Sequence, residues 1–168
     1  MRYHKLRAGE RPGTYVITEP VTEQDLLLMA NQIARKRLAK GMPITNTTNA
    51  AERLQTLLQD REHEVFAALF LDNQHRLLAF EELFRGTLDS ASIYPREVVK
   101  RGLVLNCAAI IAVHNHPSGN PEPSRSDKVF TQALKEALAL VDIRLLDHLV
   151  VAAEGVVSLV ERRELSPT

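Results

Sequence analysis

A short segment, residues 113–127, reads VHNHPSGNPEPSRSD and combines two histidines with an aspartate. His114 and His116 are two residues apart and close an apolar, β-branched run, residues 108–116, which predicts a buried strand. Side chains at positions i and i+2 of a strand project from the same face, so both imidazoles are expected side by side at its end. The spacing therefore predicts a strand that offers two nitrogen ligands to one metal ion.

The residues that follow predict a stiff loop ahead of a helix. Pro117, Pro121 and Pro123 fix backbone angles there, and Gly119 permits a turn that other residues resist. This stiffness lowers the entropy cost of bringing the chain back to the strand end. Asp127 then falls within the first turn of the next predicted helix and can supply a carboxylate oxygen. Two histidines and one carboxylate leave the fourth position of a tetrahedral zinc open for water, which is typical of catalytic zinc, although the same donors also suit other divalent metals.

The elements that must position these residues alternate along the chain. A helix is predicted from Thr22, as its N-cap, to Gly41, and a shorter one after Asn49, which has capping-box spacing to Glu52. Interleaved strands and helices favour an α/β fold in which a mixed β-sheet is sandwiched by helices. The other expected elements are a loose arm over residues 1–15, a hairpin over 64–72 and 76–87, helices over 94–106 and 124–142, and a final hairpin over 147–153 and 156–161.

Composition limits the setting of this site. The 168 residues carry 21 basic and 21 acidic side chains, and the pI is near 7.0. The overall charge therefore does not favour binding to nucleic acid or to an anionic membrane. The single cysteine excludes an internal disulfide and suits a reducing compartment. The charged N-terminus lacks the apolar core of a signal peptide, and no apolar run reaches the roughly 18 residues of a membrane span. We therefore expect a cytoplasmic protein that does not enter a membrane.

A basic run on the first predicted helix leaves two interpretations open. Arg35, Lys36, Arg37 and Lys40 are typical of a solvated helix face, and a weak nucleic-acid contact is the alternative. The arm before Thr22 could dock a second subunit, as in a homodimer, or be disordered.

Several separated motifs resemble one known family. HNHPSGNPEPSRSD matches the metal motif of the JAMM (MPN+) metalloproteases, His-x-His, seven residues, Ser, two residues, Asp, and most closely resembles that of RadC-like proteins. FRGTLDS, YPREVVKRGL, LLDHLVV and VSL agree in order and spacing, over about residues 49–168. The resemblance implies the MPN/JAB, cytidine-deaminase-like architecture over residues 46–168, after an N-terminal arm and helix over 1–45. It also implies a short form without the helix-hairpin-helix module of longer RadC proteins, and Tyr94 stands where the family's HPRE has histidine.

The resemblance further implies a zinc-dependent metallohydrolase, a metalloprotease or isopeptidase acting on a peptide or protein substrate. In such enzymes a glutamate activates a metal-bound water for attack on the carbonyl. Carried over by position, His114, His116 and Asp127 hold one Zn²⁺ per chain, Ser124 stabilises the oxyanion, and Glu64 is the general base.

Two further glutamates on the predicted hairpin, Glu81 and Glu82, are rivals for the role of base. With a turn centred in the sequence DNQH, Glu64 lies opposite Leu83, and Glu82 lies near Glu64 but faces the other side of the sheet. A one-residue slip or bulge would exchange them, because it moves every side chain to the other face. Glu64 is the favoured candidate.

Simpler roles are also open to several of these residues. Ser124 and Asp127 have the spacing of a helix capping box, and a carboxylate turned toward the cap would be turned away from a metal. His148 is expected as a hydrogen-bonded core or edge histidine, and Cys107 as a small buried hydrophobe. Two non-catalytic functions remain as alternatives: a DNA-repair or recombination accessory, as the family's traditional name indicates, and an MPN scaffold that binds partners without turnover.

Overall fold

A mixed sheet of five strands organises the computed structural model, which describes residues 5–44, 47–86 and 94–165. Its strands run in the order β4-β3-β5-β6-β7; the β5–β6 pair is parallel and the other three pairs are antiparallel. The α/β class with a mixed sheet between helices, predicted from the sequence, is confirmed. The elements are β1 (Leu6–Ala8), β2 (Tyr15–Ile17), α1 (Glu23–Arg37), α2 (Thr47–Leu58), β3 (Val65–Leu71), β4 (Leu77–Arg85), α3 (Pro95–Val104), β5 (Ala109–Asn115), α4 (Arg125–Ala139), β6 (Arg144–Ala152) and β7 (Gly155–Ser158).

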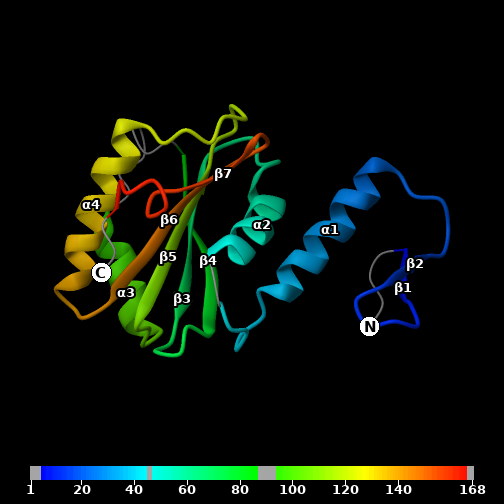
Figure 1. The fold of residues 1–168 in the computed structure, drawn as a ribbon, viewed down its shortest axis with the longest axis horizontal. Coiled ribbons are helices and arrows are strands. Elements are labelled where there is room, and N and C mark those ends of the chain that lie inside the picture. Colours follow the sequence, from blue (N-terminus) through cyan, green and yellow to red (C-terminus); the bar gives the residue numbers. More distant parts are fainter. Residues whose placement is uncertain (1–4, 45–46, 87–93, 166–168) are drawn as a thin grey trace.

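Helices cover both faces of this sheet (Figure 1). Strands β3 and β5 are buried along their whole length, which explains why their sequences are continuous apolar runs. One face of the sheet packs against α2 and the end of α1, and the other packs against α3 and α4. The end of β5 that carries the histidines therefore belongs to the middle of the sheet, between two layers of helices.

Reciprocal side-chain caps begin the two longest helices. At the start of α1 the Thr22 hydroxyl accepts the Asp25 N–H at 3.2 Å, and the Asp25 carboxylate accepts the Thr22 N–H at 2.9 Å. Helix α4 begins in the same way, with Ser124 as N-cap and Asp127 at its third position. Such caps satisfy N–H groups that have no partner within the helix. The first turn of α4, which carries Asp127, is therefore firmly held.

The N-terminal residues differ from the loose arm that the sequence predicted. Strands β1 and β2 form an antiparallel pair, and Gly13 in their connection has a φ of 79°, which favours glycine. Each strand has three residues, too few for an alternating pattern to be visible in the sequence. Figure 1 shows this hairpin at the end of α1 that points away from the main sheet.

The start of α2 also differs from the prediction. The helix begins at Thr47, so Asn49, expected as its N-cap, lies inside it.

Among the helices of the described ranges, none combines the length and apolar character needed to cross a bilayer.

Bulges shift the pairing of the strands that surround the site. The β3–β4 pairing shifts between Phe66 and Ala67 and again near the turn. The β5–β6 pairing shifts after Ile110, which pairs with Leu145, so that the next residue of β5 pairs with Asp147. A bulge adds one residue to one strand and changes which side chains face each side beyond it. These shifts therefore decide which glutamate and histidine side chains reach the end of β5.

Candidate metal centre

The three side chains predicted as metal ligands meet at the end of β5. His114 is the second-to-last residue of β5, His116 directly follows the strand, and Asp127 lies in the first turn of α4. The Nε2 atoms of the two histidines are 3.0 Å apart, and each lies 3.4 Å from a carboxylate oxygen of Asp127. In the described part of the chain, this is the group of three whose ligand atoms all lie within 4.8 Å of one another. These residues could therefore hold a metal ion.

The loop after β5 fixes the ring of His116. Its Nδ1 lies 3.0 Å from the Asn120 carbonyl oxygen, which can only accept, so Nδ1 carries the hydrogen and Nε2 keeps a lone pair. Gly119 makes the turn with a φ of 90° and donates its N–H to the His116 carbonyl at 3.1 Å. The glycine that the sequence singled out thus helps to build a loop whose backbone orients a ligand.

A buried histidine orients the ring of His114. His114 Nδ1 lies 2.8 Å from Nε2 of His148 on β6, and His148 Nδ1 is hydrogen-bonded to the hydroxyl of Thr131. The expectation that His148 is a hydrogen-bonded core histidine is confirmed, since its side chain is fully buried. Burial lowers the pKa of His148 well below its ordinary value, so the ring is uncharged at neutral pH.

The convergence of these atoms fits a cation. When Nδ1 of both histidines donates outward, each Nε2 presents a lone pair, and the two lone pairs face each other across 3.0 Å. A positive charge between them and the carboxylate relieves this repulsion. A tetrahedral zinc with bonds of about 2.0–2.1 Å places neighbouring ligand atoms about 3.3–3.4 Å apart. The observed separations of 3.0 and 3.4 Å are close to that geometry.

Asp127 serves the helix cap and the ligand cluster together. Its Oδ2 accepts the Ser124 N–H at 2.7 Å, while Oδ1 and Oδ2 each lie 3.4 Å from a histidine nitrogen. The expectation that capping turns the carboxylate away from the metal position is wrong, because one carboxylate has two oxygens with several lone pairs. Burial alone raises the pKa of Asp127, but the hydrogen bonds that His114 and His116 donate when their rings are protonated, together with that of Ser124, outweigh it and hold this pKa well below its usual range.

Ser124 stands at the rim of the cluster. Its Oγ accepts the Asp127 N–H at 3.1 Å, as a helix N-cap does. That bond uses an oxygen lone pair and leaves the hydroxyl hydrogen available to another acceptor. The side chain is exposed, so a substrate could reach it.

Glu64 lies directly before β3, near the ligand cluster. Its carbonyl accepts the Gly86 N–H at 2.9 Å, so the predicted pairing of Glu64 with Leu83 is wrong. Three displacements of one residue add up: the turn between Asp72 and Arg76 is one residue longer than assumed, and the β3–β4 ladder shifts at Phe70/Leu71 and at Phe66/Ala67. The pKa of His116 is raised, chiefly because its protonated ring can donate a hydrogen bond to Asp127 and in smaller part because the charge of Glu64 lies within electrostatic range of the ring.

The two rival glutamates are engaged elsewhere. The Glu82 carboxylate accepts a hydrogen bond from Arg61 at 2.6 Å, and Arg101 donates two hydrogen bonds of 2.6 Å to Glu81. Glu82 pairs with Ala67, which belongs to the face of the sheet covered by α2. Both carboxylates are therefore held in ion pairs on β4.

Asn115 is a residue that sequence reasoning missed. Its fully buried side chain accepts the Val65 N–H at 2.7 Å through Oδ1 and donates to the His63 carbonyl at 3.2 Å through Nδ2. These are the backbone groups on either side of Glu64. The signal in the sequence was a polar residue at the end of a buried strand, because buried amides need hydrogen-bond partners.

Other residues singled out by the sequence have structural positions. Cys107 is buried, as predicted, and burial raises the pKa of its thiol to about 11. Tyr94 precedes α3 at the N-cap, makes no side-chain cap, and lies under the guanidinium of Arg96 at 5.1 Å. The four side chains of the basic run in and after α1 are exposed, as on a solvated helix face, and a nucleic-acid contact stays a prediction.

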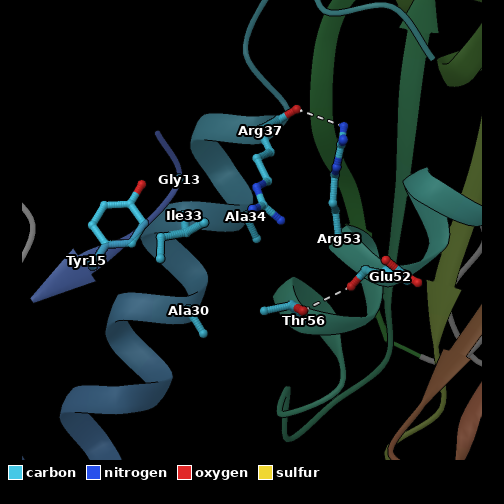
Figure 2. A pocket seen from close by; sticks show the side chains of 9 residues that line it. All are labelled: Gly13, Tyr15, Ala30, Ile33, Ala34, Arg37, Glu52, Arg53 and Thr56. Atoms are coloured by element: carbon cyan, nitrogen blue, oxygen red, sulfur yellow. Dashed lines mark hydrogen bonds between the residues drawn. The ribbon is translucent and has the colours of Figure 1, made fainter. Parts of the chain in front are cut away.

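A pocket of about 540 Å³ lies apart from the ligand cluster, between β2, α1 and α2 (Figure 2). At one side of it Arg53 donates a hydrogen bond of 3.1 Å to the Arg37 carbonyl. Its described lining includes one carboxylate, from Glu52, and neither histidine nor cysteine. The pocket therefore offers a metal ion far fewer ligands than the end of β5. Its lining residues are Gly13, Tyr15, Ala30, Ile33, Ala34, Arg37, Glu52, Arg53 and Thr56.

A mixed sheet between helices, with two histidines and an aspartate gathered at the end of its central strand, defines an α/β domain of the JAB class. Residues 44–165 match the family model described as "RadC-like JAB domain". The chain belongs to this RadC-like family.

Three relatives illustrate its place in the family. A UPF0758 protein of Vibrio cholerae is 53% identical over 142 residues, 84% of this chain and 90% of that protein. A UPF0758 protein of Methylibium petroleiphilum is 62% identical over 135 residues, 78% of this chain and 61% of that protein. One of Alcanivorax borkumensis is 51% identical over 146 residues, 84% of this chain and 65% of that protein. The match thus spans less than two thirds of the length of the last two relatives.

Proposed function

We propose that this protein is a zinc-dependent hydrolase of peptide or isopeptide bonds. One observation carries the proposal: three ligands with converging lone pairs gather at the end of β5, with the Glu64 carboxylate in electrostatic range of His116. Two imidazoles and one carboxylate are a donor set of catalytic zinc, which keeps a further position open. The likeness of the motif to that of the JAMM metalloproteases, together with membership of the RadC-like JAB family, supports the same reaction class.

Each residue of the site has a role in this proposal. His114, His116 and Asp127 would hold the zinc, which would supply Lewis acidity and lower the pKa of a water from about 16 to about 7. Glu64 accepts a proton from the attacking water and returns it to the leaving amine. Ser124 donates its free hydroxyl hydrogen to the carbonyl oxygen as that oxygen gains negative charge.

The substrate in this proposal is a peptide or a protein. A scaffold that binds partners without turnover would have no use for a base beside an intact ligand set. A DNA accessory would depend on the exposed basic run in and after α1, which is distant in sequence from the ligand residues. The hydrolase is therefore the function that the geometry favours.

Metal content tests the first half of the proposal. Untagged wild-type protein should contain about one zinc per chain by plasma mass spectrometry, and Asp127→Ala should lose most of it. Asp25→Ala is the matched control, because it removes the same kind of capping box from α1 and leaves the ligands intact. Wild-type protein that binds no metal when zinc is offered, or an Asp127→Ala variant that keeps it, would contradict the proposal.

Hydrolysis tests the second half. Zinc-loaded protein should cleave members of a peptide or isopeptide library, and Glu64→Gln should lower the rate by about 10²-fold or more, as loss of a general base does. Glu62→Gln is the matched control, since Glu62 is an exposed carboxylate two residues away. Equal rates for the two variants would exclude Glu64 as the base.

A further inference from the structure

A buried chain of hydrogen bonds connects two of the three ligands behind the metal centre. It runs from His114 through His148 on β6 to Thr131 in α4, and it ends at the backbone carbonyl of Asp127. The four residues are exposed by 1%, 0%, 1% and 2%, in that order. The chain is therefore shielded from bulk solvent.

The hydrogen bond from Thr131 to the Asp127 carbonyl fixes which atom donates in every other bond of this chain. The Thr131 hydroxyl lies 2.6 Å from the Asp127 carbonyl, which can only accept, so the hydroxyl hydrogen points to that carbonyl. Thr131 then has only lone pairs to offer, and His148 must donate through Nδ1–H. A neutral His148 consequently accepts at Nε2, and His114 must donate through its own Nδ1–H. The outcome is a lone pair on His114 Nε2, the atom that faces Asp127.

We propose that His148 and Thr131 are positioning residues that fix His114 in the tautomer able to bind a metal. The inference rests on the metal-binding part of the proposed function. Neither residue touches the metal position: Thr131 acts through His148, and His148 acts through His114. Because the chain begins at one ligand and ends on the backbone of another, it also fixes β5 and α4 relative to each other across β6.

Loss of the Thr131 hydroxyl should allow donor and acceptor to exchange roles in the hydrogen bond between His114 and His148. Without that hydroxyl, His148 Nδ1 has no buried partner, and its hydrogen can move to Nε2. His148 would then donate to His114 Nδ1, and the hydrogen of His114 would move to Nε2, where it blocks a metal bond. Outer partners of metal-bound histidines typically change metal affinity by about 10–100-fold.

The test compares Thr131→Val, which keeps the shape and loses the hydroxyl, with Thr131→Ser, which keeps the hydroxyl. Zinc affinity is measured by competition with a chelator, and thermal unfolding reports whether each variant folds. The tautomer of His114 is read in metal-free, ¹⁵N-histidine-labelled protein by long-range NMR correlation, at a pH where the imidazoles are uncharged. The His114 signals are assigned by their loss in His114→Gln.

The valine variant should bind zinc about 10–100-fold more weakly than wild type and show His114 with hydrogen on Nε2. The serine variant should restore both the affinity and the Nδ1–H tautomer. Equal affinities for the two variants would overturn the inference, and so would weaker binding without a change of tautomer, because that result means a packing defect. A wild-type protein that binds no zinc would instead overturn the proposed function, while the metal-free NMR comparison would still decide the inference.

A second pair of variants keeps the test decisive if Thr131→Val fails to fold. His148→Gln supplies an amide oxygen that can accept from His114 Nδ1–H, whereas His148→Leu supplies no acceptor. Zinc affinity should fall at least about tenfold further in the leucine variant than in the glutamine variant. The same affinity in both would show that His148 acts only as a filler of the core.

Discussion

Replacing Asn115 by leucine should detach the segment that carries Glu64 from the end of β5. Leucine has a similar size but no polar atom, so the Val65 N–H and the His63 carbonyl both lose their partner. A buried group left without a partner costs about 1–3 kcal/mol, and the first of these bonds is buried. The second is partly buried, so water recovers part of its cost. We therefore expect the free energy of unfolding to fall by about 2–3 kcal/mol.

Thermal and denaturant unfolding of the metal-free protein measure this loss. For a chain of 168 residues, about 2–3 kcal/mol corresponds to a melting temperature lower by about 4–12 °C. Hydrolysis at saturating zinc should fall by at least about tenfold, because a displaced base loses its orientation toward the water. Asn31→Leu is the control, since its amide donates to a carbonyl within α1 at an exposed site, and it should change stability by no more than about 0.5 kcal/mol.

Two results would refute this reasoning. A melting temperature of Asn115→Leu within about 1 °C of wild type would mean that the two backbone groups find other partners. Undiminished hydrolysis in a folded, destabilised variant would mean that the position of Glu64 does not depend on Asn115.

Three further predictions concern acidic and thiol groups. Burial raises the pKa of Asp147, so the contribution of this carboxyl group to the free energy of unfolding is full below its unfolded pKa of about 4 and is lost as pH rises through its folded pKa. In urea unfolding measured against pH, Asp147→Asn should lack this decline in stability. A parallel decline in the variant would contradict the assignment to Asp147. Cys107, with a pKa of about 11, should react with a thiol reagent at pH 8 far more slowly than free cysteine, and Cys107→Ala should hydrolyse substrate at the wild-type rate; fast labelling of folded protein would be the contrary result. Replacing Glu81 or Glu82 by glutamine should leave hydrolysis within about threefold of wild type in a peptide assay, since both carboxylates are held in ion pairs with arginines, and a loss comparable to that of Glu64→Gln would reassign the base.

The ligand cluster was predictable because local rules fix each of its members. Alternation along a strand places His114 and His116 together, and a capped helix start places Asp127 within one turn of a proline-rich loop. The mixed sheet between helices followed from the order of apolar runs. What the local rules got wrong was the assumption that Asp127 must choose between cap and metal, since the two oxygens of one carboxylate reach both.

The supporting residues were not predictable in the same way, because their partners are far apart in sequence. The contact between His114 and His148 joins residues 34 positions apart, and that between Val65 and Asn115 joins residues 50 apart. Which residue of β4 lies opposite Glu64 depends on two shifts in the β3–β4 ladder, and no residue pattern in the hairpin marks where such shifts occur.

The bulge in β6 sets the register in which this strand pairs with β5. With Leu146 as the extra residue, Ala112 pairs with His148. If Leu146 instead paired regularly with Ile111, Ala112 would pair with Asp147, and the histidine would move to the opposite face of the sheet. The position of His148 behind the candidate metal centre thus depends on the bulge at Leu146 as well as on the identity of the histidine. Deleting Leu146 would make the ladder regular and still leave Asp147 opposite Ile111 and His148 opposite Ala112, so His148 should keep its place behind the ligand cluster.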